Sequence, residues 1–190
     1  MTATDLRNPE TIRQIYRRHG RGIFNYALRL IGDYQWAEEI LQETFLRAYA
    51  RAETFKEGAR VSTWLYRIAM NLCYDHLRSP RNRPKVSLSA RPAGSEDQTS
   101  LVDRMETGEP GPDERVEALE VGAIVRAAVS ELPDKERNVL ILRHYEGLKF
   151  REIAEVTGLT TRTVQNCLRR AREKLSRSLI RAGLEPQEVI

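Results

Sequence analysis

The chain has 190 residues, a formal net charge of +4 and 41% hydrophobic residues, which predicts one domain or two small ones with compact cores. It shows no basic segment followed by an apolar run at its start, and no apolar stretch of about 18 residues, so we expect neither a signal peptide nor a membrane span. Cys73 and Cys167 lie far apart and form no CxxC pair, which excludes a disulfide framework and fits a cytoplasmic protein.

The N-terminal part predicts two amphipathic helices separated by a glycine. Asn8 can cap a helix that begins with Pro9, and apolar residues recur at helical spacing until Gly32 ends it. Asp33 can cap the second helix, AEEILQETFLRAY at residues 37–49, which has apolar residues on one side and glutamates on the other. The glutamates are typical of a solvated face, and they also fit a surface that docks on a partner protein. Composition does not decide between the two.

The third helix, WLYRIAMNLCYDHLR at residues 64–78, carries an unusual polar stripe. Ser62 and Thr63 can cap it. The residues spaced three or four apart on one face are Trp64, Arg67, Asn71, Asp75 and Arg78. A surface stripe needs no Trp, and a core stripe needs no Arg or Asn. The pattern therefore indicates a face that meets something charged and able to stack.

Residues 80–113 separate two predicted units, at 8–79 and 114–182. Their Pro, Ser, Gly and charged residues show almost no periodicity, which is typical of a linker. From residue 80 to residue 114 there are five basic and seven acidic residues, so the segment is slightly acidic. No part of the chain shows sustained strand alternation. We therefore predict an all-α fold of two small helical domains joined by a flexible linker.

The second unit predicts a helix-turn-helix near its end. Asp113 can cap a first helix, Leu132-Pro133 breaks it, and Asp134 starts another. A short helix, KFREIAEVTG, then reaches Gly158, and Thr160 or Thr161 can cap the final helix. A short helix, a glycine turn and a second polar helix together match the helix-turn-helix plan.

The final helix concentrates positive charge, with seven basic residues and one acid from Arg162 to Arg181, a net +6. Side chains at its start can reach base edges: Arg162, Thr163, Gln165 and Asn166. Cations further along suit phosphates: Arg169, Arg170, Arg172 and Lys174. An Arg-rich helix is often only a solvated amphipathic helix, but the glycine turn and the clustering favour DNA binding.

Other chemistries lack support in the sequence. His19, His76 and His144 are isolated from Cys and carboxylates at ligand spacing, so no metal site is expected. No Gly-rich phosphate loop or nucleophile elbow is present, so we expect no cofactor, no catalytic residues and no enzyme activity. Two alternatives stay open: a regulator that binds duplex DNA alone, and a nucleic-acid-processing enzyme with Asp75 and the glutamates as metal ligands.

The whole chain resembles the extracytoplasmic-function (ECF) class of bacterial sigma factors. The resemblance rests on AEEILQETFLRAY, STWLYRIAMN, LPDKER and FREIAE…TVQNCLRRARE at these separations. Residues 10–79 look like conserved region two, and residues 113–180 look like region four. The resemblance implies a protein that binds core RNA polymerase, brings it to promoters, helps to melt them and is later released.

The resemblance also implies roles for particular residues. The segment that matches the part docking on the polymerase clamp helices contains Asp33, Glu38, Glu39, Gln42, Glu43, Phe45 and Leu46. Arg67 and Asn71 match positions at the non-template strand and a flipped base of the minus-ten element, and the stripe around them is expected to share that contact. Trp64 fits either a contact or a core anchor.

The final helix matches the reader of the minus-thirty-five element, and region four also implies contact with the polymerase flap. Many relatives have Arg or Ser where this chain has Gln165 and Asn166. The linker from Pro80 to Asp113 is expected to thread the polymerase cleft. An anti-sigma factor is a further expected partner.

Overall fold

The structure is a computed structural model that describes residues 3–79 and 112–184. Every regular element in these two ranges is helical, which confirms the all-α prediction. The elements are α1 (Ala3–Leu6), α2 (Pro9–Ile31), α3 (Tyr34–Ala50), the 3-10 turn η1 (Ala52–Thr54), α4 (Val61–Arg78), α5 (Pro112–Ser130), α6 (Asp134–His144), α7 (Phe150–Thr157) and α8 (Thr161–Arg181). None of the helices in the described ranges is both long and apolar enough to cross a bilayer. Most of the expected linker lies outside the described residues.

Local capping sets most helix ends where they were predicted. The Asn8 side chain accepts a hydrogen bond of 2.9 Å from the Glu10 backbone N–H and begins α2. Gly32 ends that helix with a φ of 81°, a left-handed conformation that favours glycine. Asp33 then caps α3 by accepting from the Trp36 backbone N–H at 3.0 Å.

Two predicted caps are wrong. Helix α4 begins at Val61, so Ser62 and Thr63 lie within its first turn, and Thr63 is buried. Helix α5 begins at Pro112, so Asp113 lies inside the helix. In both cases the helix begins one or two residues before the predicted capping residue. Proline in the first turn and tertiary packing also determine where a helix begins.

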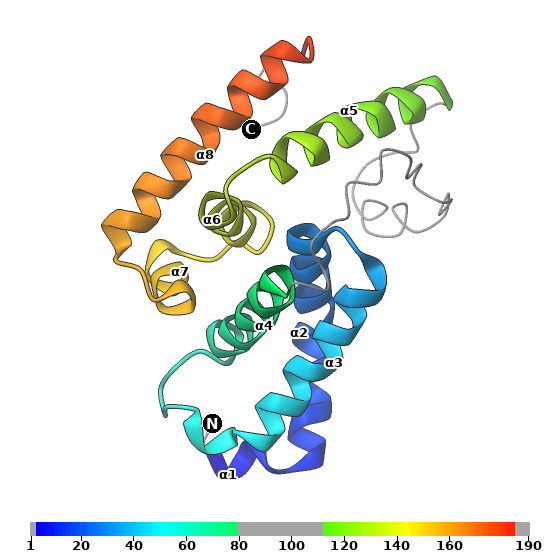
Figure 1. Ribbon diagram of the computed structural model, residues 1–190. Helices are drawn as coiled ribbons and strands as arrows, with labels where there is room; N and C mark the ends of the chain where they lie inside the picture. Colours follow the sequence, from blue (N-terminus) through cyan, green and yellow to red (C-terminus); the bar gives the residue numbers. More distant parts are fainter. Residues whose placement is uncertain (1–2, 80–111, 185–190) are drawn as a thin grey trace.

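Helices α2, α3 and α4 pack against one another and form the N-terminal unit (Figure 1). Its core is apolar and drawn from all three helices: Ile23, Tyr26 and Ala27 from α2, Ala37, Ile40 and Phe45 from α3, and Leu65, Ala69 and Cys73 from α4. The buried residues of α4 fall on one side of that helix. Its polar stripe is therefore left on the opposite side.

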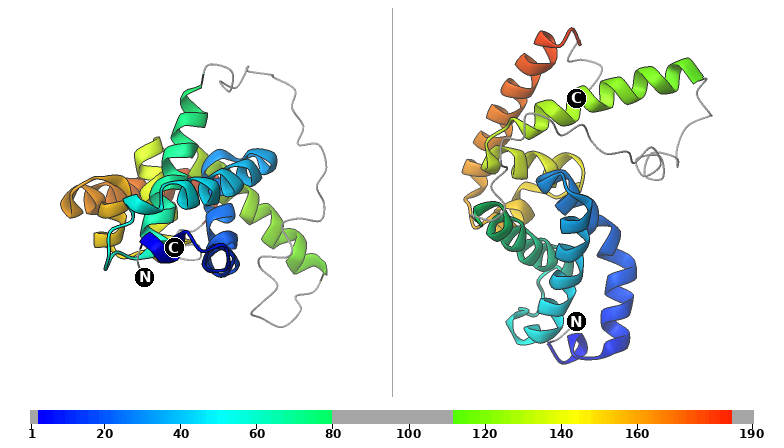
Figure 2. Two further views of the ribbon diagram at one scale, coloured as in Figure 1. Left: turned by 90° about the horizontal axis from the view of Figure 1, so that it is seen from below. Right: turned by 45° about the vertical axis from the view of Figure 1, so that its right-hand side comes forward.

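Helices α5 to α8 form the C-terminal unit, in which α8 packs against α5, α6 and α7. Val164, Leu168 and Ala171 of α8 are buried together with Ile153 of α7. Figures 1 and 2 show α5 and α8 extending away from the N-terminal unit, with α6 and α7 between.

The two units pack against each other, which the sequence analysis did not predict. Helix α4 lies against α7, and α2 lies against α6. The buried apolar residues of both units form one continuous cluster. The contact between the units also contains hydrogen bonds and ion pairs, so it is a specific interface with defined partners.

Candidate nucleic-acid and protein interfaces

The polar stripe of α4 points away from the core. Arg67, Asn71, Asp75 and Arg78 are exposed, while Leu65, Ala69 and Cys73 on the other side of the helix are buried. Because one helix carries both faces, the buried side holds the stripe in a fixed orientation. Two guanidinium groups and one amide are thereby presented together on a rigid element.

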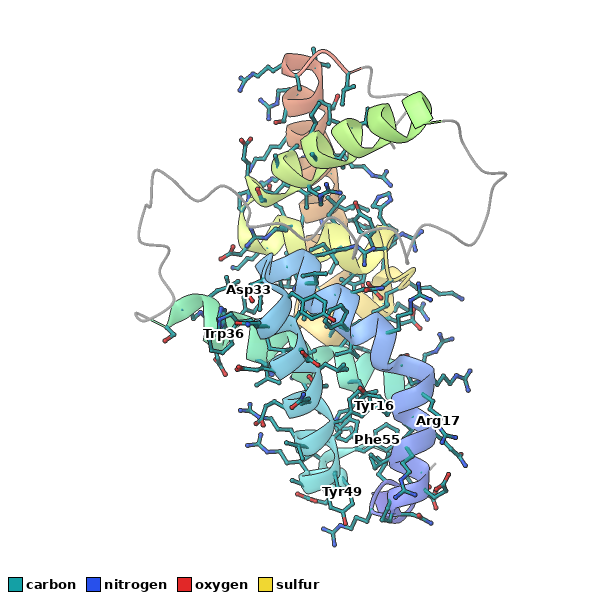
Figure 3. All side chains as sticks on the ribbon, turned by 90° about the vertical axis from the view of Figure 1, so that its right-hand side faces the viewer. Tyr16, Arg17, Asp33, Trp36, Tyr49 and Phe55 are labelled. Carbon is teal, nitrogen blue, oxygen red and sulfur yellow. The ribbon has the colours of Figure 1, made fainter. Side chains whose placement is uncertain are left out.

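Trp64 is the exception in the stripe, because it is half-buried. Its ring packs edge-on against Phe55 with ring centroids 5.3 Å apart, and Phe55 is 5% exposed. Figure 3 shows Phe55 directed into the N-terminal unit. Trp64 therefore anchors the start of the stripe to the core and keeps part of its surface accessible.

Helix α3 presents an acidic and apolar outer face. Glu38, Glu39, Gln42 and Leu46 are exposed, with Leu46 at 65%. Two predicted residues of this set have local partners: Asp33 caps the helix, and Glu43 accepts a 2.7 Å hydrogen bond from Arg47 Nε. A face of this composition suits a partner with apolar and basic groups.

Phe45 was expected on this face but lies in the core. It is 6% exposed, and its ring packs edge-on against Tyr16 at 4.9 Å. It falls on the same side of α3 as Ile40 and Leu41, so its helical position places it inward. Phe45 packs beneath the outer face of α3 and is not accessible to a partner.

The sequence analysis missed the aromatic residues around this face. Trp36 and Tyr49 on α3 are 37% and 47% exposed, and the Trp36 ring lies 4.1 Å from that of His76 on α4. Tyr16 and Arg17 line a groove of about 360 Å³ between α2 and α3; Figure 3 shows Trp36, Tyr49, Tyr16 and Arg17 on this side of the unit. The available signal was that Trp36 lies three residues before Glu39, which places both on one face.

The helix-turn-helix has the predicted turn. Gly158 ends α7 with a φ of 71°, and the Thr160 hydroxyl accepts from the Thr163 backbone N–H at 3.2 Å and caps α8. On α8, the residues opposite the buried Val164, Leu168 and Ala171 form an exposed outer face: Arg162, Gln165, Asn166, Arg169 and Arg170. Three arginines and two amides thus project from the start of a well-capped helix.

Internal contacts occupy four of the eight predicted residues of α8. The Thr163 hydroxyl lies 2.8 Å from that of Thr160, and Arg169 pairs with Glu173 on the exposed face. Arg172 Nη2 is 3.1 Å from His144 Nε2, and Lys174 Nζ is 2.8 Å from Glu136 Oε2. Lys174 and Arg172 flank the outer face and hold α8 against α6. Their charged groups are therefore partly engaged in contacts within the protein.

The protonation state of His144 makes the stability of the fold depend on pH. Arginine only donates hydrogen bonds, so His144 Nε2 accepts from Arg172 and the ring is neutral. Burial, followed by the charges of Arg172 and Arg143, lowers the pKa of His144 below its ordinary value of 6.5. A lowered folded-state pKa means that the neutral ring stabilises the fold above about pH 6.5, and that this stability is lost as pH falls through the lower pKa.

We therefore expect the melting temperature to fall between about pH 7.5 and about pH 5, and His144→Gln to reduce that fall, because glutamine accepts the same hydrogen bond without titrating. Thermal unfolding of the two proteins across this range provides the measurement. His19 and His76 also have lowered pKa values, so the variant should flatten the slope without abolishing it. Identical slopes would contradict the assignment.

The described residues contain no metal-binding cluster, and one of the two cysteines is buried. No group of three or more His, Cys, Asp and Glu side chains in ranges 3–79 and 112–184 is placed to hold a metal ion. Cys73 is buried, and burial raises the pKa of its thiol to about 12. It therefore acts as a small apolar side chain of the core.

The chain thus combines two helical units, a helix-turn-helix with a basic outer face on α8, and an acidic and apolar outer face on α3. The family model described as Sigma-70 region 2 matches residues 15–83, and the model described as Sigma-70 region 4 matches residues 123–175. The chain is 35% identical over 157 residues to the ECF RNA polymerase sigma factor SigW of Bacillus subtilis, covering 83% of this chain and 82% of that protein. It is 32% identical over 158 residues to the RNA polymerase sigma-H factor of Pseudomonas aeruginosa, covering 83% and 80%.

The chain belongs to the ECF class of RNA polymerase sigma factors. It is therefore an initiation factor that binds core RNA polymerase, directs it to promoters and promotes their melting. Among solved structures, it is similar to CnrH in complex with the cytosolic domain of CnrY, with a TM-score of 0.66, 23% identity and 95% coverage of both chains. At that identity the likeness supports the fold alone.

Proposed function

We propose that the three exposed faces divide the work of initiation: α3 binds core polymerase, α4 holds the melted minus-ten strand, and α8 reads the minus-thirty-five element. The observation that carries the proposal is the stripe on α4, where Arg67 and Asn71 project from a helix whose other side is buried. Neither folding nor packing of α4 requires these side chains. The domain limits, 8–79 and 114–182 with a linker at 80–113, belong to the same proposal.

The chemistry of the α4 stripe suits a single DNA strand. Arg67 and Arg78 offer positive charge to successive phosphates. The Asn71 amide has both a donor and an acceptor and can pair with the edge of an unstacked base. Trp64, held against Phe55, supplies an aromatic surface at the start of the stripe. We assign Asp75, on the same face, the role of orienting Arg67 or Arg78, because a carboxylate adds nothing favourable toward phosphate.

The chemistry of the α8 outer face suits duplex DNA. Gln165 and Asn166 can each form two hydrogen bonds with adenine in the major groove, and Arg162 can do so with guanine. Arg169 and Arg170 lie one turn further along and suit phosphates. Since Thr163, Arg172 and Lys174 have internal partners, they support the position of α8 first and contact DNA second.

The proposal also covers regulation and cellular location. The chain acts without an enzyme activity of its own, in the cytoplasm, and an anti-sigma factor keeps it inactive by covering the polymerase-binding and DNA-binding faces. One similar fold, the sigma factor RpoE from Bartonella quintana, was solved in complex with the anti-sigma factor NepR, and another, CnrH, was solved in complex with the cytosolic domain of CnrY. An affinity capture from the source cells with the full chain as bait tests this part.

A run-off transcription series with core polymerase and a promoter library tests the central proposal. Specific transcripts that depend on the full chain support it. A chain that binds specific duplex DNA tightly without polymerase, and yields no transcript with it, is an independent regulator instead. DNA cleavage that depends on an added divalent metal would favour the processing enzyme.

Arg170→Ala is expected to weaken binding of the holoenzyme to promoter DNA and to reduce the salt dependence of that binding by about one phosphate contact, a slope change of about 0.9. Promoter affinity measured across a range of salt concentrations gives the slope. Arg181→Ala is the matched control, because it removes an exposed arginine from the last turn of the same helix. Equal slopes for the two variants would exclude a phosphate contact at Arg170.

A further inference from the structure

Helix α1 precedes residue 8, the predicted start of the first unit, and the sequence assigned it no role. It has only four residues, Ala3–Leu6, and a helix of one turn is not stable by itself in water, so tertiary contacts hold it. The Leu6 side chain is 0% exposed and belongs to the apolar core. Helix α1 packs against α2 and against η1, the turn that follows α3 (Figure 1).

Polar contacts hold the end of α1 on two sides. Arg7 Nη2 lies 3.3 Å from Glu53 Oε2 of η1, and these residues are 46 positions apart in the chain. The Asn8 backbone N–H donates to the Asp5 carbonyl oxygen at 3.1 Å, and the Asn8 side chain caps α2. Because the ion pair is exposed and therefore weak, the buried Leu6 contributes most to holding α1 in place. We call Leu6, Arg7 and their contact with η1 the N-terminal clip.

The turn η1 leads directly to the aromatic pair at the start of α4. The Phe55 backbone N–H donates to the Ala52 carbonyl oxygen at 3.1 Å, so Phe55 is held at the end of η1. Ala52 is fully buried and Phe55 nearly so. The Phe55 ring packs against Trp64, the first residue of the α4 stripe. A packed path thus runs from Leu6 through η1 and Phe55 to Trp64.

Local hydrogen bonds shape the segment between α3 and α4. The Thr54 backbone N–H and hydroxyl both donate to the Arg51 carbonyl oxygen, at 2.9 and 2.8 Å, and the Ala59 N–H donates to the Lys56 carbonyl oxygen at 3.0 Å. Bonds that span three residues define a turn, but they do not fix its orientation relative to a neighbouring helix. That orientation depends on the side chains that pack against the turn, and α1 supplies one of these contacts.

We propose that the N-terminal clip is a positioning element for promoter melting, in which Leu6 and Arg7 act as positioning residues through η1 and Phe55. The clip holds the Trp64 ring in the orientation in which its exposed part continues the α4 stripe. The inference rests on the proposed function, in which that stripe holds the melted strand. Because base stacking depends on the orientation of the aromatic ring, a support that fixes the ring beforehand lowers the cost of ordering it on binding.

Simple packing is the competing explanation, in which Leu6 fills the core and has no effect on DNA. The two explanations differ in what a substitution of Leu6 changes. Packing alone lowers the melting temperature, as other large-to-small substitutions in a core do. Positioning also changes the surroundings of Trp64 and the extent of promoter opening. Polymerase affinity stays constant, because packing against α2 and α4 fixes α3 independently of the clip.

Leu6→Ala tests the clip in the full chain, and Leu30→Ala is the matched control. Both remove the same atoms from a buried leucine of the N-terminal unit, since the two residues are 0% and 2% exposed. Leu30 lies near the other end of α2, far from α1 along that helix. Both variants should have a lowered melting temperature in thermal unfolding, and the remaining assays are run well below both transitions.

The fluorescence of Trp64 reports its surroundings. The chain has two tryptophans, so Trp36→Phe leaves Trp64 as the single emitter in the free chain. In this background we expect Leu6→Ala to shift the emission to longer wavelength and to increase quenching by acrylamide, because Trp64 loses the support of Phe55. Leu30→Ala should leave both quantities unchanged.

Promoter opening reports the functional consequence, measured by permanganate reactivity with chains that retain Trp36. Opening should fall about tenfold in Leu6→Ala if only about a tenth of the molecules keep Trp64 in the competent orientation. Leu30→Ala should open promoters like the wild type. Titration with core polymerase should give the same affinity for all three chains.

Arg7→Glu tests the clip without disturbing the core, because Arg7 is exposed. It places two carboxylates opposite each other and should reduce promoter opening about twofold, the scale of an exposed ion pair. Arg7→Glu combined with Glu53→Arg should restore opening. With a Leu6→Ala chain that does not fold, these two variants decide: wild-type opening in Arg7→Glu, or a loss that the double variant does not restore, rejects the clip.

Two results would overturn the proposal. Equal Trp64 emission and equal promoter opening in Leu6→Ala and Leu30→Ala would show that α1 only packs against the core. A parallel loss of polymerase affinity and promoter opening in Leu6→Ala would place α1 in the polymerase-binding surface instead.

The outcomes are separable from those of the proposed function. Normal opening in Leu6→Ala together with defective opening in Asn71→Ala would reject the clip and leave the proposed function intact. A shifted Trp64 emission in Leu6→Ala, with normal opening in Asn71→Ala and Arg67→Ala, would reject the role of the α4 stripe and leave only the structural link between α1 and Trp64.

Discussion

Leu46→Arg is expected to weaken binding to core RNA polymerase by about 100-fold, or roughly 2.7 kcal/mol. Leu46 is 65% exposed and lies among the acidic residues of α3, so a partner that covers this face would bury it. Arginine would place a charge where an apolar contact forms. It would also add a positive charge to an acidic face that suits a basic partner, so it would repel that partner. Titration of labelled protein with core polymerase gives the affinity.

The chain offers a close control for this prediction. Ile180 is another exposed aliphatic residue, at 59%, but it lies near the end of α8. Ile180→Arg makes a comparable change far from α3. Both variants should fold normally, because substitutions at exposed positions usually change the free energy of unfolding by less than about 0.5 kcal/mol. Equal polymerase affinities for the two variants would show that the α3 face is not part of the surface that binds polymerase.

Asn71→Ala is expected to reduce promoter opening by about 10- to 100-fold and to leave polymerase binding unchanged, because it removes both the donor and the acceptor offered to an unstacked base. Asn71 is exposed on α4, so the substitution leaves no buried cavity. Arg67→Ala should have a smaller effect of the same kind through the loss of a phosphate contact. Permanganate reactivity of the melted strand measures opening, and holoenzyme titration measures binding.

Two further variants sharpen this prediction. Asn71→Asp keeps the size of the side chain but loses both donors and adds a negative charge next to DNA, so it should be at least as defective as Asn71→Ala. Arg13→Ala removes an exposed arginine from α2, where its partner is Glu10 in the same helix, and serves as the control for Arg67→Ala. Loss of polymerase affinity with normal opening in the α4 variants would show that the stripe binds polymerase instead of DNA.

Local sequence signals predicted much of the fold. Asn8, Gly32 and Thr160 mark helix ends through hydrogen bonds or backbone conformations that involve residues only a few positions away. The stripe of α4 and the outer face of α8 follow from helical periodicity, which depends only on spacing. These local signals did not locate every helix start. Ser62 and Thr63 are good capping residues, but helix α4 starts before them.

The candidate site could be predicted only in part. Phe45 and Leu46 are neighbours in an apolar stretch, and the expected set contained both, yet one is buried and the other is exposed. Arg170 and Arg172 are both arginines of α8 and look alike in the sequence, but only Arg172 has a partner on α6, His144. Trp36 and Tyr49 were missed because aromatic residues in an amphipathic helix are ordinarily assigned to the core.

By itself, the sequence determined two helical units, the caps of α2, α3 and α8, a basic helix-turn-helix and the resemblance to one family of transcription factors. Only the tertiary structure decided that the units dock, since Tyr26 meets Asn138 and Tyr66 meets Glu146 across 112 and 80 positions of the chain. Periodicity and capping are interactions within one or two turns, so they are visible in a short stretch of sequence. A pair brought together from distant helices leaves no such pattern.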